Sequence, residues 1–149
     1  MFGACRLISY FCKHNDALIY IITYKMQYDL RRFIRAQEWT YDDALAEVKA
    51  GKKRTHWIWY IFPQMKGLGK SGMSQTYGIK GREEAKAYIE NPLLRQRLVE
   101  ITQAVLDSDK SVYEIFGQDA IKVQSCMKLF STVCDEPVFK RMMAKYNWH

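Results

Sequence analysis

From residue 29 onward, apolar positions recur every three or four residues, which is the spacing of helices that bury one face. The first such stretch, 30–36, follows Asp29, whose side chain can accept a hydrogen bond from the first turn of a helix. Leu30, Phe33 and Ile34 share one face of this stretch. The pattern predicts a short amphipathic helix that Asp29 caps.

A second helix is expected directly afterwards. Thr40, followed three residues later by Asp43, resembles a capping box at a helix start. The helical pattern then covers 41–50 and stops at Gly51, the residue type that most often follows a helix end. Two separate helices are therefore predicted before the chain turns at Gly51.

Four further helices are predicted, with starts at a glycine, a proline or an acidic residue. In the stretch from 119 to 133, one helical register contains Ile121, Val123, Met127, Phe130 and Cys134. The expected ranges are 81–90, 92–106, 119–133 and 137–146.

The apolar run 57–62 fits either a buried strand or a buried helical turn. No second strand is apparent beyond the first 27 residues, so we interpret this run as helical. The sequence therefore predicts an all-α fold, a compact single-domain helical bundle over 28–149 with a glycine-rich loop at about 64–81. At 149 residues the chain is long enough for one domain with its own core.

The first 27 residues differ in character from the rest. The run 18–24 is β-branched and aromatic, with strand-like propensity, and it is too short to span a bilayer. Polar and charged residues at 13–16 interrupt the apolar character that a signal peptide needs. No transmembrane segment is predicted. We interpret 1–27 as an appendage outside the fold, either an addition to the protein or sequence upstream of a start at Met26.

The chain is basic, with 23 Lys and Arg against 16 Asp and Glu and a formal net charge of +7. The cations are interleaved with acids and never form the run of like charges that is typical of a nucleic-acid-binding tail. Nucleic acid is disfavoured as a partner but left open. The basic residues expected to be mostly exposed are Arg31, Arg32, Arg35, Lys52, Lys53 and Arg54.

The four cysteines, at positions 5, 12, 126 and 134, include no Cys-x-x-Cys pair and have no histidine at zinc-finger spacing. No metal site is predicted. Cys126 and Cys134 are too far apart along one helix for a disulfide. Buried free thiols in a reducing compartment, the cytoplasm, are therefore expected.

The segment from His56 to Ile79 has a composition that packing alone does not explain. An apolar and aromatic run leads into four glycines, two lysines and several hydroxyl and amide side chains. This combination suits a site that holds an anionic or planar ligand against backbone amides. The candidate ligand-binding residues are His56, Trp57, Gln64, Gly67, Gly69, Lys70, Ser71 and Tyr77.

A true phosphate-binding P-loop is not expected in this segment. Gln64 occupies the position of the first glycine of that motif, and the glycines after Lys70 make a helix improbable there. A looser nest of backbone N–H groups from 67–71, together with Lys70, is one interpretation. The other is that the glycines only provide a tight path around a packed helix.

His56 also has two interpretations. As a general base or a ligand it would titrate near neutral pH, whereas as a packing residue it would be hydrogen-bonded at a helix start. Among the neighbouring aromatic residues, Trp57 and Tyr60 share one helical side, and Trp59 and Phe62 share another. Most of these rings are expected in the core, with one face as a potential platform for a planar ligand.

A series of motifs resembles a known family. The series includes Asp29-Leu-Arg-Arg-Phe33, His56-Trp57-x-Trp59-x-Ile61-Phe62-Pro63-Gln64, Gly67-Leu68-Gly69-x-Ser71, Ser74-x-x-Tyr77-Gly78-Ile79, Glu84-Ala85-x-Ala87-Tyr88, Asn91-Pro92-Leu93, Ile115-Phe116-Gly117 and Ser125-x-Met127-x-Leu129-Phe130. Over about 28–146, this order and spacing resemble the widespread, mainly bacterial family labelled domain of unknown function 1810. Some members carry the label calpastatin, which nothing in these residues supports.

The resemblance implies a compact bundle of α-helices and no established reaction, cofactor or catalytic residue. Family members usually begin close to the motif at 29–33, so 1–27 are extra relative to them. They also usually continue past the last helix into a short tail that this sequence does not include.

Three functions stay open at this point. The leading hypothesis is a small binding domain for an anionic or aromatic ligand in a cleft formed by 56–79. The second is an enzyme, a hydrolase or transferase on a nucleotide-like substrate, with His56 as acid or base and Lys70 stabilising negative charge. The third is a module that binds a protein or nucleic acid through basic helical faces. Neither a cofactor nor an oligomeric state is indicated.

Overall fold

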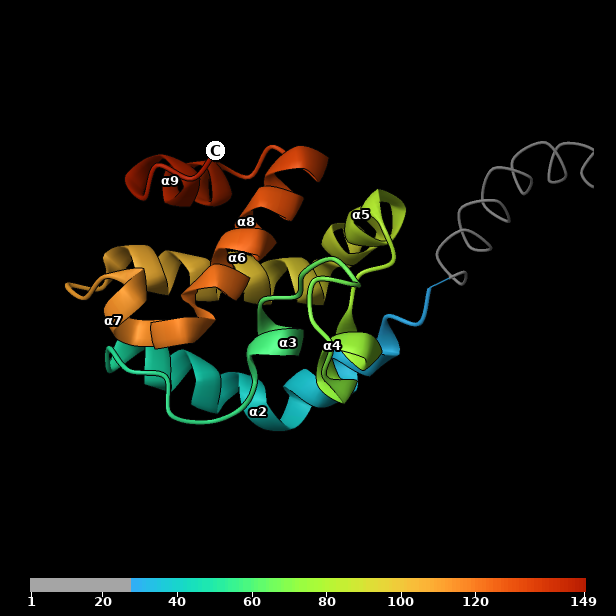
Figure 1. Ribbon diagram of the computed structural model, residues 1–149, viewed down its shortest axis with the longest axis horizontal. Helices are drawn as coiled ribbons and strands as arrows, with labels where there is room; N and C mark the ends of the chain where they lie inside the picture. The colour runs from blue at the N-terminus through green and yellow to red at the C-terminus, as the bar shows by residue number, and fades with distance from the viewer. Residues whose placement is uncertain (1–27) are drawn as a thin grey trace, which may run out of the picture.

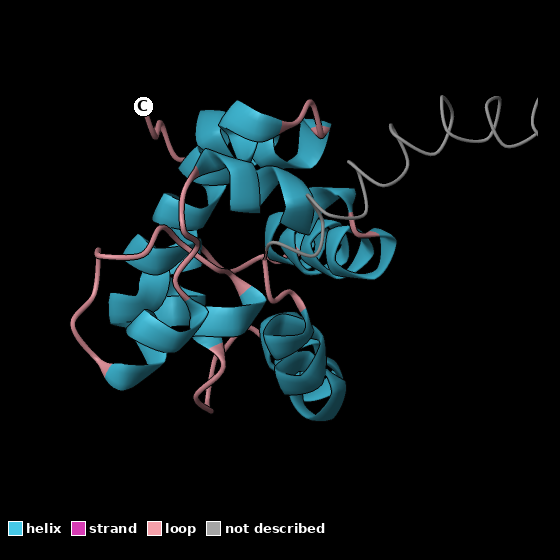
Figure 2. Cartoon of the chain, turned by 90° about the vertical axis from the view of Figure 1, so that its right-hand side faces the viewer, coloured by secondary structure: helices cyan, strands magenta, loops and turns pink. Residues whose placement is uncertain are grey.

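The computed structural model describes residues 28–149, where all regular structure is helical (Figures 1 and 2). The all-α fold predicted from the sequence is confirmed. The helices are α2 (Arg31–Lys49), α3 (Ile58–Ile61), α4 (Gly72–Tyr77), α5 (Arg82–Glu90), α6 (Pro92–Asp107), α7 (Val112–Phe116), α8 (Ala120–Val133) and α9 (Pro137–Lys145), with a 3-10 turn at Gly117–Asp119 before α8.

Helix α6 lies at the centre of the bundle. It packs against α2 on one side and α9 on the other, and its start contacts α5 (Figure 1). Helix α8 crosses this layer and packs against α3, α5 and α9. The short helix α3, formed by the aromatic run, is thus enclosed between α2 and α8, as the helical interpretation of 57–62 predicts.

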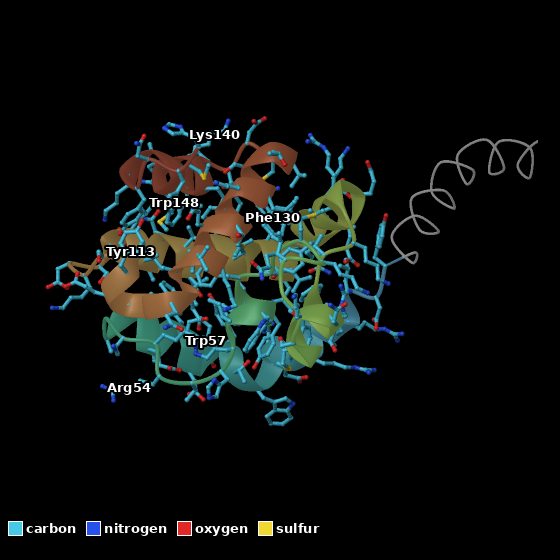
Figure 3. The ribbon with its side chains drawn as sticks, viewed as in Figure 1. Arg54, Trp57, Tyr113, Phe130, Lys140 and Trp148 are labelled. Carbon is cyan, nitrogen blue, oxygen red and sulfur yellow. The ribbon has the colours of Figure 1, made fainter. Side chains whose placement is uncertain are left out.

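A line of aromatic rings joins four helices through the core. Phe33 of α2 lies edge-on to Tyr88 of α5 with ring centroids 5.1 Å apart, and Tyr88 contacts Phe130 of α8 at 5.2 Å. Phe130 in turn contacts Phe139 of α9 at 6.2 Å, so the last helix packs on α8. Figure 3 shows Trp57 and Phe130 inside the molecule, whereas Arg54 and Lys140 point outward from opposite sides.

The predicted break at Thr40 is wrong, because α2 is one continuous helix of 19 residues. The Thr40 hydroxyl donates to the carbonyl of Ala36 at 2.7 Å, the bond that a threonine makes in a helix interior. Asp29 does not cap the helix either. Leu30 is the N-cap residue and makes no side-chain cap bond, and the Asp29 carboxylate pairs with Arg31 at 3.8 Å.

The expectation that no helix follows Lys70 is also wrong. The Ser71 hydroxyl oxygen accepts a hydrogen bond from the N–H of Ser74 at 3.1 Å and caps α4. A serine at the N-cap stabilises the start of a helix. Two smaller differences remain. Ile121 is 66% exposed rather than part of the core, and α7 is a helix that the sequence did not predict.

The expectations for the N-terminal segment lie outside the described residues. These are the appendage over 1–27, the start at Met26 and the free thiols at positions 5 and 12. Within the described part, Cys126 and Cys134 are both free; Cys126 is buried as predicted, whereas Cys134 is only half-buried.

Candidate functional site

Residues 64–79 form a loop whose two ends lie side by side. The N–H of Lys66 donates to the carbonyl of Ile79 at 2.8 Å, and the N–H of Ile79 donates to the carbonyl of Gln64 at 2.9 Å. These bonds make an isolated parallel bridge between Met65 and Ile79. The bridge closes the segment into a compact loop that contains α4.

Two glycines of the loop are required by its geometry. Gly67 has a φ of +96°, which residues with a side chain rarely adopt. At Gly78 a Cβ would lie 2.7 Å from the Cα of Lys66 and 2.7 Å from the carbonyl oxygen of Ser74. Backbone atoms cannot move aside as the end of a flexible side chain can. The tight-path interpretation therefore accounts for these two glycines.

The outer part of the loop leaves backbone donors open. No acceptor within 28–149 takes the N–H groups of residues 67–71. Lys70 and Ser71 are exposed beside them. An anion nest needs such open N–H groups, so the nest interpretation of the sequence stays a prediction beside the tight-turn one.

A buried ion pair anchors this loop to the bundle. The Arg32 guanidinium donates to both carboxylate oxygens of Glu84, at 2.8 and 3.2 Å, and the Glu84 side chain is fully buried. The same guanidinium donates to the carbonyls of Thr76 at 2.9 Å and Gly78 at 3.1 Å. Because Arg32 belongs to α2 and Glu84 to α5, the pair connects two helices with the end of the loop.

A second anchor holds the segment before α3. The Glu47 carboxylate accepts hydrogen bonds from the indole N–H of Trp57 at 2.9 Å and from the backbone N–H and hydroxyl of Thr55, both at 2.7 Å. Burial alone would raise the pKa of Glu47. The hydrogen bonds from Thr55, Trp57 and the N–H of Arg54 outweigh it, so the pKa lies below its ordinary value.

A groove of about 480 Å³ lies between the loop and two helices. Met65 and Leu68 form the loop side, Arg82 comes from the start of α5, and four residues of α8 form the other side. The Arg82 guanidinium donates to the carbonyl of Thr132 at 2.7 Å, which fixes it at the rim. The α8 residues are Ser125, Lys128, Leu129 and Thr132. We call this space the α8 groove.

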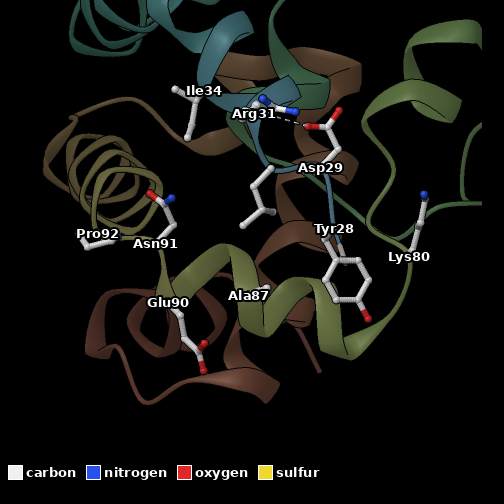
Figure 4. A pocket seen from close by; sticks show the side chains of 10 residues that line it. Tyr28, Asp29, Arg31, Ile34, Lys80, Ala87, Glu90, Asn91 and Pro92 are labelled. Atoms are coloured by element: carbon white, nitrogen blue, oxygen red, sulfur yellow. Dashed lines mark ion pairs between the residues drawn. The ribbon is translucent and has the colours of Figure 1, made fainter. Parts of the chain in front are cut away.

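A second cavity, of about 660 Å³, lies between the start of α2 and α5 (Figure 4). Its lining includes Asp29, Arg31, Lys80 and Glu90, two acids and two cations. Asp29 and Arg31 pair with each other. The charges of this cavity balance, whereas the charged residues that line the α8 groove are both positive.

The basic residues do not gather on one face. Arg31, Arg32 and Arg35 lie at the start of α2, and Lys52 to Arg54 lie beyond its other end, roughly 28 Å away along the helix. Lys53 pairs with Asp119 at 3.0 Å, and Arg32 pairs with Glu84. The side chains of Lys53 and Arg32 are both largely buried. Arg31, Arg35, Lys52 and Arg54 are exposed as predicted.

The described residues contain no group of three or more potential metal ligands. Burial raises the pKa of the Cys126 thiol well above its ordinary value, which keeps this cysteine protonated and unreactive. Within residues 28–149, every helix is too short or too polar to cross a membrane.

Comparisons with known proteins agree with the motif series. The family model described as "Protein of unknown function (DUF1810)" matches residues 27–148. The chain belongs to the DUF1810 family. Among solved structures, it is similar to the conserved hypothetical protein Rv1873 from Mycobacterium tuberculosis, with 42% identity and a TM-score of 0.80 over 83% of this chain and 91% of that one. A comparison with curated proteins gives no significant match.

In this DUF1810 domain, the eight predicted ligand-binding residues differ in burial. Trp57 and Gln64 are buried, at 1% and 8% exposure, and Gly69 and Tyr77 are half-buried. Tyr77 packs against Tyr60 with ring centroids 5.0 Å apart. The exposed members are His56, Gly67, Lys70 and Ser71. None of the eight lines the α8 groove or the second cavity.

His56 has no side-chain hydrogen bond to another described residue, and only its carbonyl is engaged, by the Tyr60 hydroxyl at 3.4 Å. The aromatic run is mostly core, as expected, since Trp57, Tyr60 and Phe62 are buried and Trp59 is half-buried. Lys122 lies over the Trp59 ring at 5.6 Å, so this ring is partly covered by a cation.

Sequence reasoning missed the helical side of the α8 groove. Ser125, Lys128, Leu129 and Thr132 have the i, i+3, i+4, i+7 spacing of one helix face, which was available as a signal. Nothing in that spacing indicates that the face lies opposite a loop some 60 residues earlier in the sequence. That juxtaposition comes from the packing of α5 against α8.

Proposed function

We propose that the protein is a ligand-binding domain whose small ligand carries an anionic group and docks beside the glycine-rich loop. The observation behind this proposal is the charge of the α8 groove. Its charged lining residues within the described chain are Arg82 and Lys128, both positive, and Lys128 forms no ion pair with another described residue. An anion placed between them gains a Coulomb interaction that no neighbouring carboxylate of the lining weakens.

The size of the groove suits a small molecule. Ligand pockets in proteins typically have volumes of about 300–1,000 Å³, with apolar walls and a few polar groups that fix orientation. The α8 groove, at about 480 Å³, has apolar walls from Met65, Leu68 and Leu129 and two cationic groups. This is the combination expected for a ligand with an apolar body and one charged end.

The predicted loop residues enter the proposal in two roles. The open N–H groups around Gly67 and Gly69, with Lys70 and Ser71, add positive potential on the loop side. Trp57, Gln64 and Tyr77 are buried or half-buried and would support the loop from beneath. The proposal thus keeps the loop as the binding element and assigns the direct apolar and ionic contacts to the α8 groove.

A thermal-shift screen of nucleotides, sugar phosphates and carboxylates tests the proposal, because a ligand that binds only the folded state raises the melting temperature. We expect at least one anion to raise it, and Lys128→Gln to abolish that shift. Lys86→Gln, an exposed charge on α5 outside the groove lining, is the matched control and should keep the shift. The absence of any anion-dependent shift, or a shift that survives Lys128→Gln, would contradict the proposal.

A further inference from the structure

We infer that the α8 groove binds an aliphatic monocarboxylate, with its alkyl chain along the groove and its carboxylate between Lys128 and Arg82. This inference rests on the proposed function and narrows the ligand to one chemical class. Three properties of the groove support it: the type of apolar side chain in its walls, the donors left for an anion, and the length of the α8 face in its lining.

The apolar walls are aliphatic. Met65, Leu68 and Leu129 supply them, and no aromatic ring is among the described lining residues. The ring of the loop, Tyr77, is engaged in the core through its contacts with Phe33 at 6.0 Å and Tyr60 at 5.0 Å. A planar aromatic ligand would find no stacking partner in these walls, whereas flexible Met and Leu side chains adapt to an alkyl chain.

The donors at the rim match a carboxylate. One nitrogen of Arg82 already donates to Thr132, and the Ser125 hydroxyl donates to the carbonyl of Ile121 at 3.0 Å. The Lys128 ammonium, the remaining N–H groups of the Arg82 guanidinium and the open backbone N–H of Leu68 stay available to a carboxylate. A phosphate monoester would use the same donors, and the titrations with phosphate esters described below distinguish it from a carboxylate.

The α8 side of the groove extends along the helix. Ser125 and Thr132, the first and last α8 residues of the lining, are seven residues apart on one helix face, roughly 10 Å along the axis. Leu68, 62% exposed, lines the groove on the loop side. A bound alkyl chain of about eight carbons has a comparable length and would remove Leu68 and Leu129 from water together.

Calorimetric titration with butyrate, hexanoate and octanoate tests the inference directly. We expect Kd to fall by up to about fourfold for each methylene that enters the groove. Octanamide, which has the same chain without the charge, should bind more weakly than octanoate. Lys128→Gln should remove this difference, and Leu68→Ser, a change at an exposed position that leaves the core intact, should flatten the dependence on chain length. Lys86→Gln should behave as the unmodified protein.

Titrations with other ligands distinguish a failure of this inference from a failure of the proposed function. If benzoate or a phosphate ester binds more tightly than octanoate and its binding needs Lys128, the aliphatic inference is overturned and the proposed function stands. If no anion binds, both are overturned. Co-sedimentation with phosphatidylglycerol vesicles is the last test. If the protein binds these vesicles but not octanoate, the groove binds a membrane surface, and the inference of a free carboxylic acid as ligand is overturned.

Discussion

The indole N–H of Trp57 donates to the Glu47 carboxylate at 2.9 Å, so a residue near the end of α2 fixes the first ring of the aromatic run. Glu47→Ala removes this acceptor together with the acceptor for Thr55. The buried indole N–H then lacks a partner, which costs about 1–3 kcal/mol of unfolding free energy. Urea unfolding followed by tryptophan fluorescence measures the loss. Glu38→Ala, at an exposed position of the same helix, is the control, and equal stability of the two variants would refute the role of Glu47.

The lowered pKa of Glu47 predicts a pH dependence with a definite sign. A carboxylate with a depressed pKa in the folded state contributes stability above its unfolded pKa, about 4.3, and this contribution is lost as the pH falls through the lower folded value. Glu47→Gln should therefore reduce the fall in melting temperature that occurs as the pH is lowered from 7 to 3. If the melting temperature of the variant falls as steeply with acid as that of the unmodified protein, other carboxylates account for the pH dependence.

Glu84→Gln should be among the most destabilising single substitutions at a charged residue. The change leaves the guanidinium of Arg32, whose side chain is 14% exposed, without its counter-charge. Breaking a buried ion pair in this way costs about 3–5 kcal/mol. Chemical denaturation measures the cost, and Glu90→Gln on the exposed side of α5 provides the comparison. A loss below that range would mean that water reaches the pair and screens it.

Alanine substitutions at two glycines of the loop should have different effects on stability. Gly78→Ala places a methyl group 2.7 Å from backbone atoms of Lys66 and Ser74 and should destabilise the fold by about 1–3 kcal/mol. Gly72→Ala meets nothing within 4 Å and lies in the first turn of α4, so it should be neutral or stabilise by up to about 1 kcal/mol. Thermal unfolding of the two variants checks the pair. Equal effects would mean that the loop packing described for Gly78 is not the native one.

Deleting residues 1–25, so that translation begins at Met26, should leave cooperative unfolding nearly unchanged. The matched family pattern begins at residue 27, and the helices from α2 onward bury their own apolar faces. Calorimetric melting of the shortened protein measures this. A shortened protein that is insoluble or melts without cooperativity would show that the run 18–24 is part of the core.

Helix boundaries could be predicted from the sequence where a local signal had no competitor. Gly81, Pro92 and Pro137 mark starts that the structure reproduces within a residue. Thr40 gave a false start because its hydroxyl can bond either forward, as a cap, or back to the carbonyl of Ala36. The uninterrupted buried face from Phe33 to Val48 decides between the two, and that face is recognised only when the helix is considered as a whole.

The candidate site was only partly predictable for a different reason. The loop has a local signature, so its position and its glycines could be anticipated. Arg82, Lys128 and Leu129 carry no such signature, because charged and aliphatic residues on helices are usually solvated surface or core. They can be identified as candidate site residues only from the tertiary packing that brings α5 and α8 to the same side of the loop.

The bridge between Met65 and Ile79 has a consequence for how this fold can change over time. Because the two ends of the loop already meet at the bridge, its exposed tip at about 67–70 can lengthen, shorten or be exchanged while α4 and Tyr77 stay packed on the bundle. The entropy of closing such a segment changes only slowly with its length, so insertions at its tip are tolerated. Selection can therefore alter the loop side of the α8 groove while the bundle that supports it stays the same.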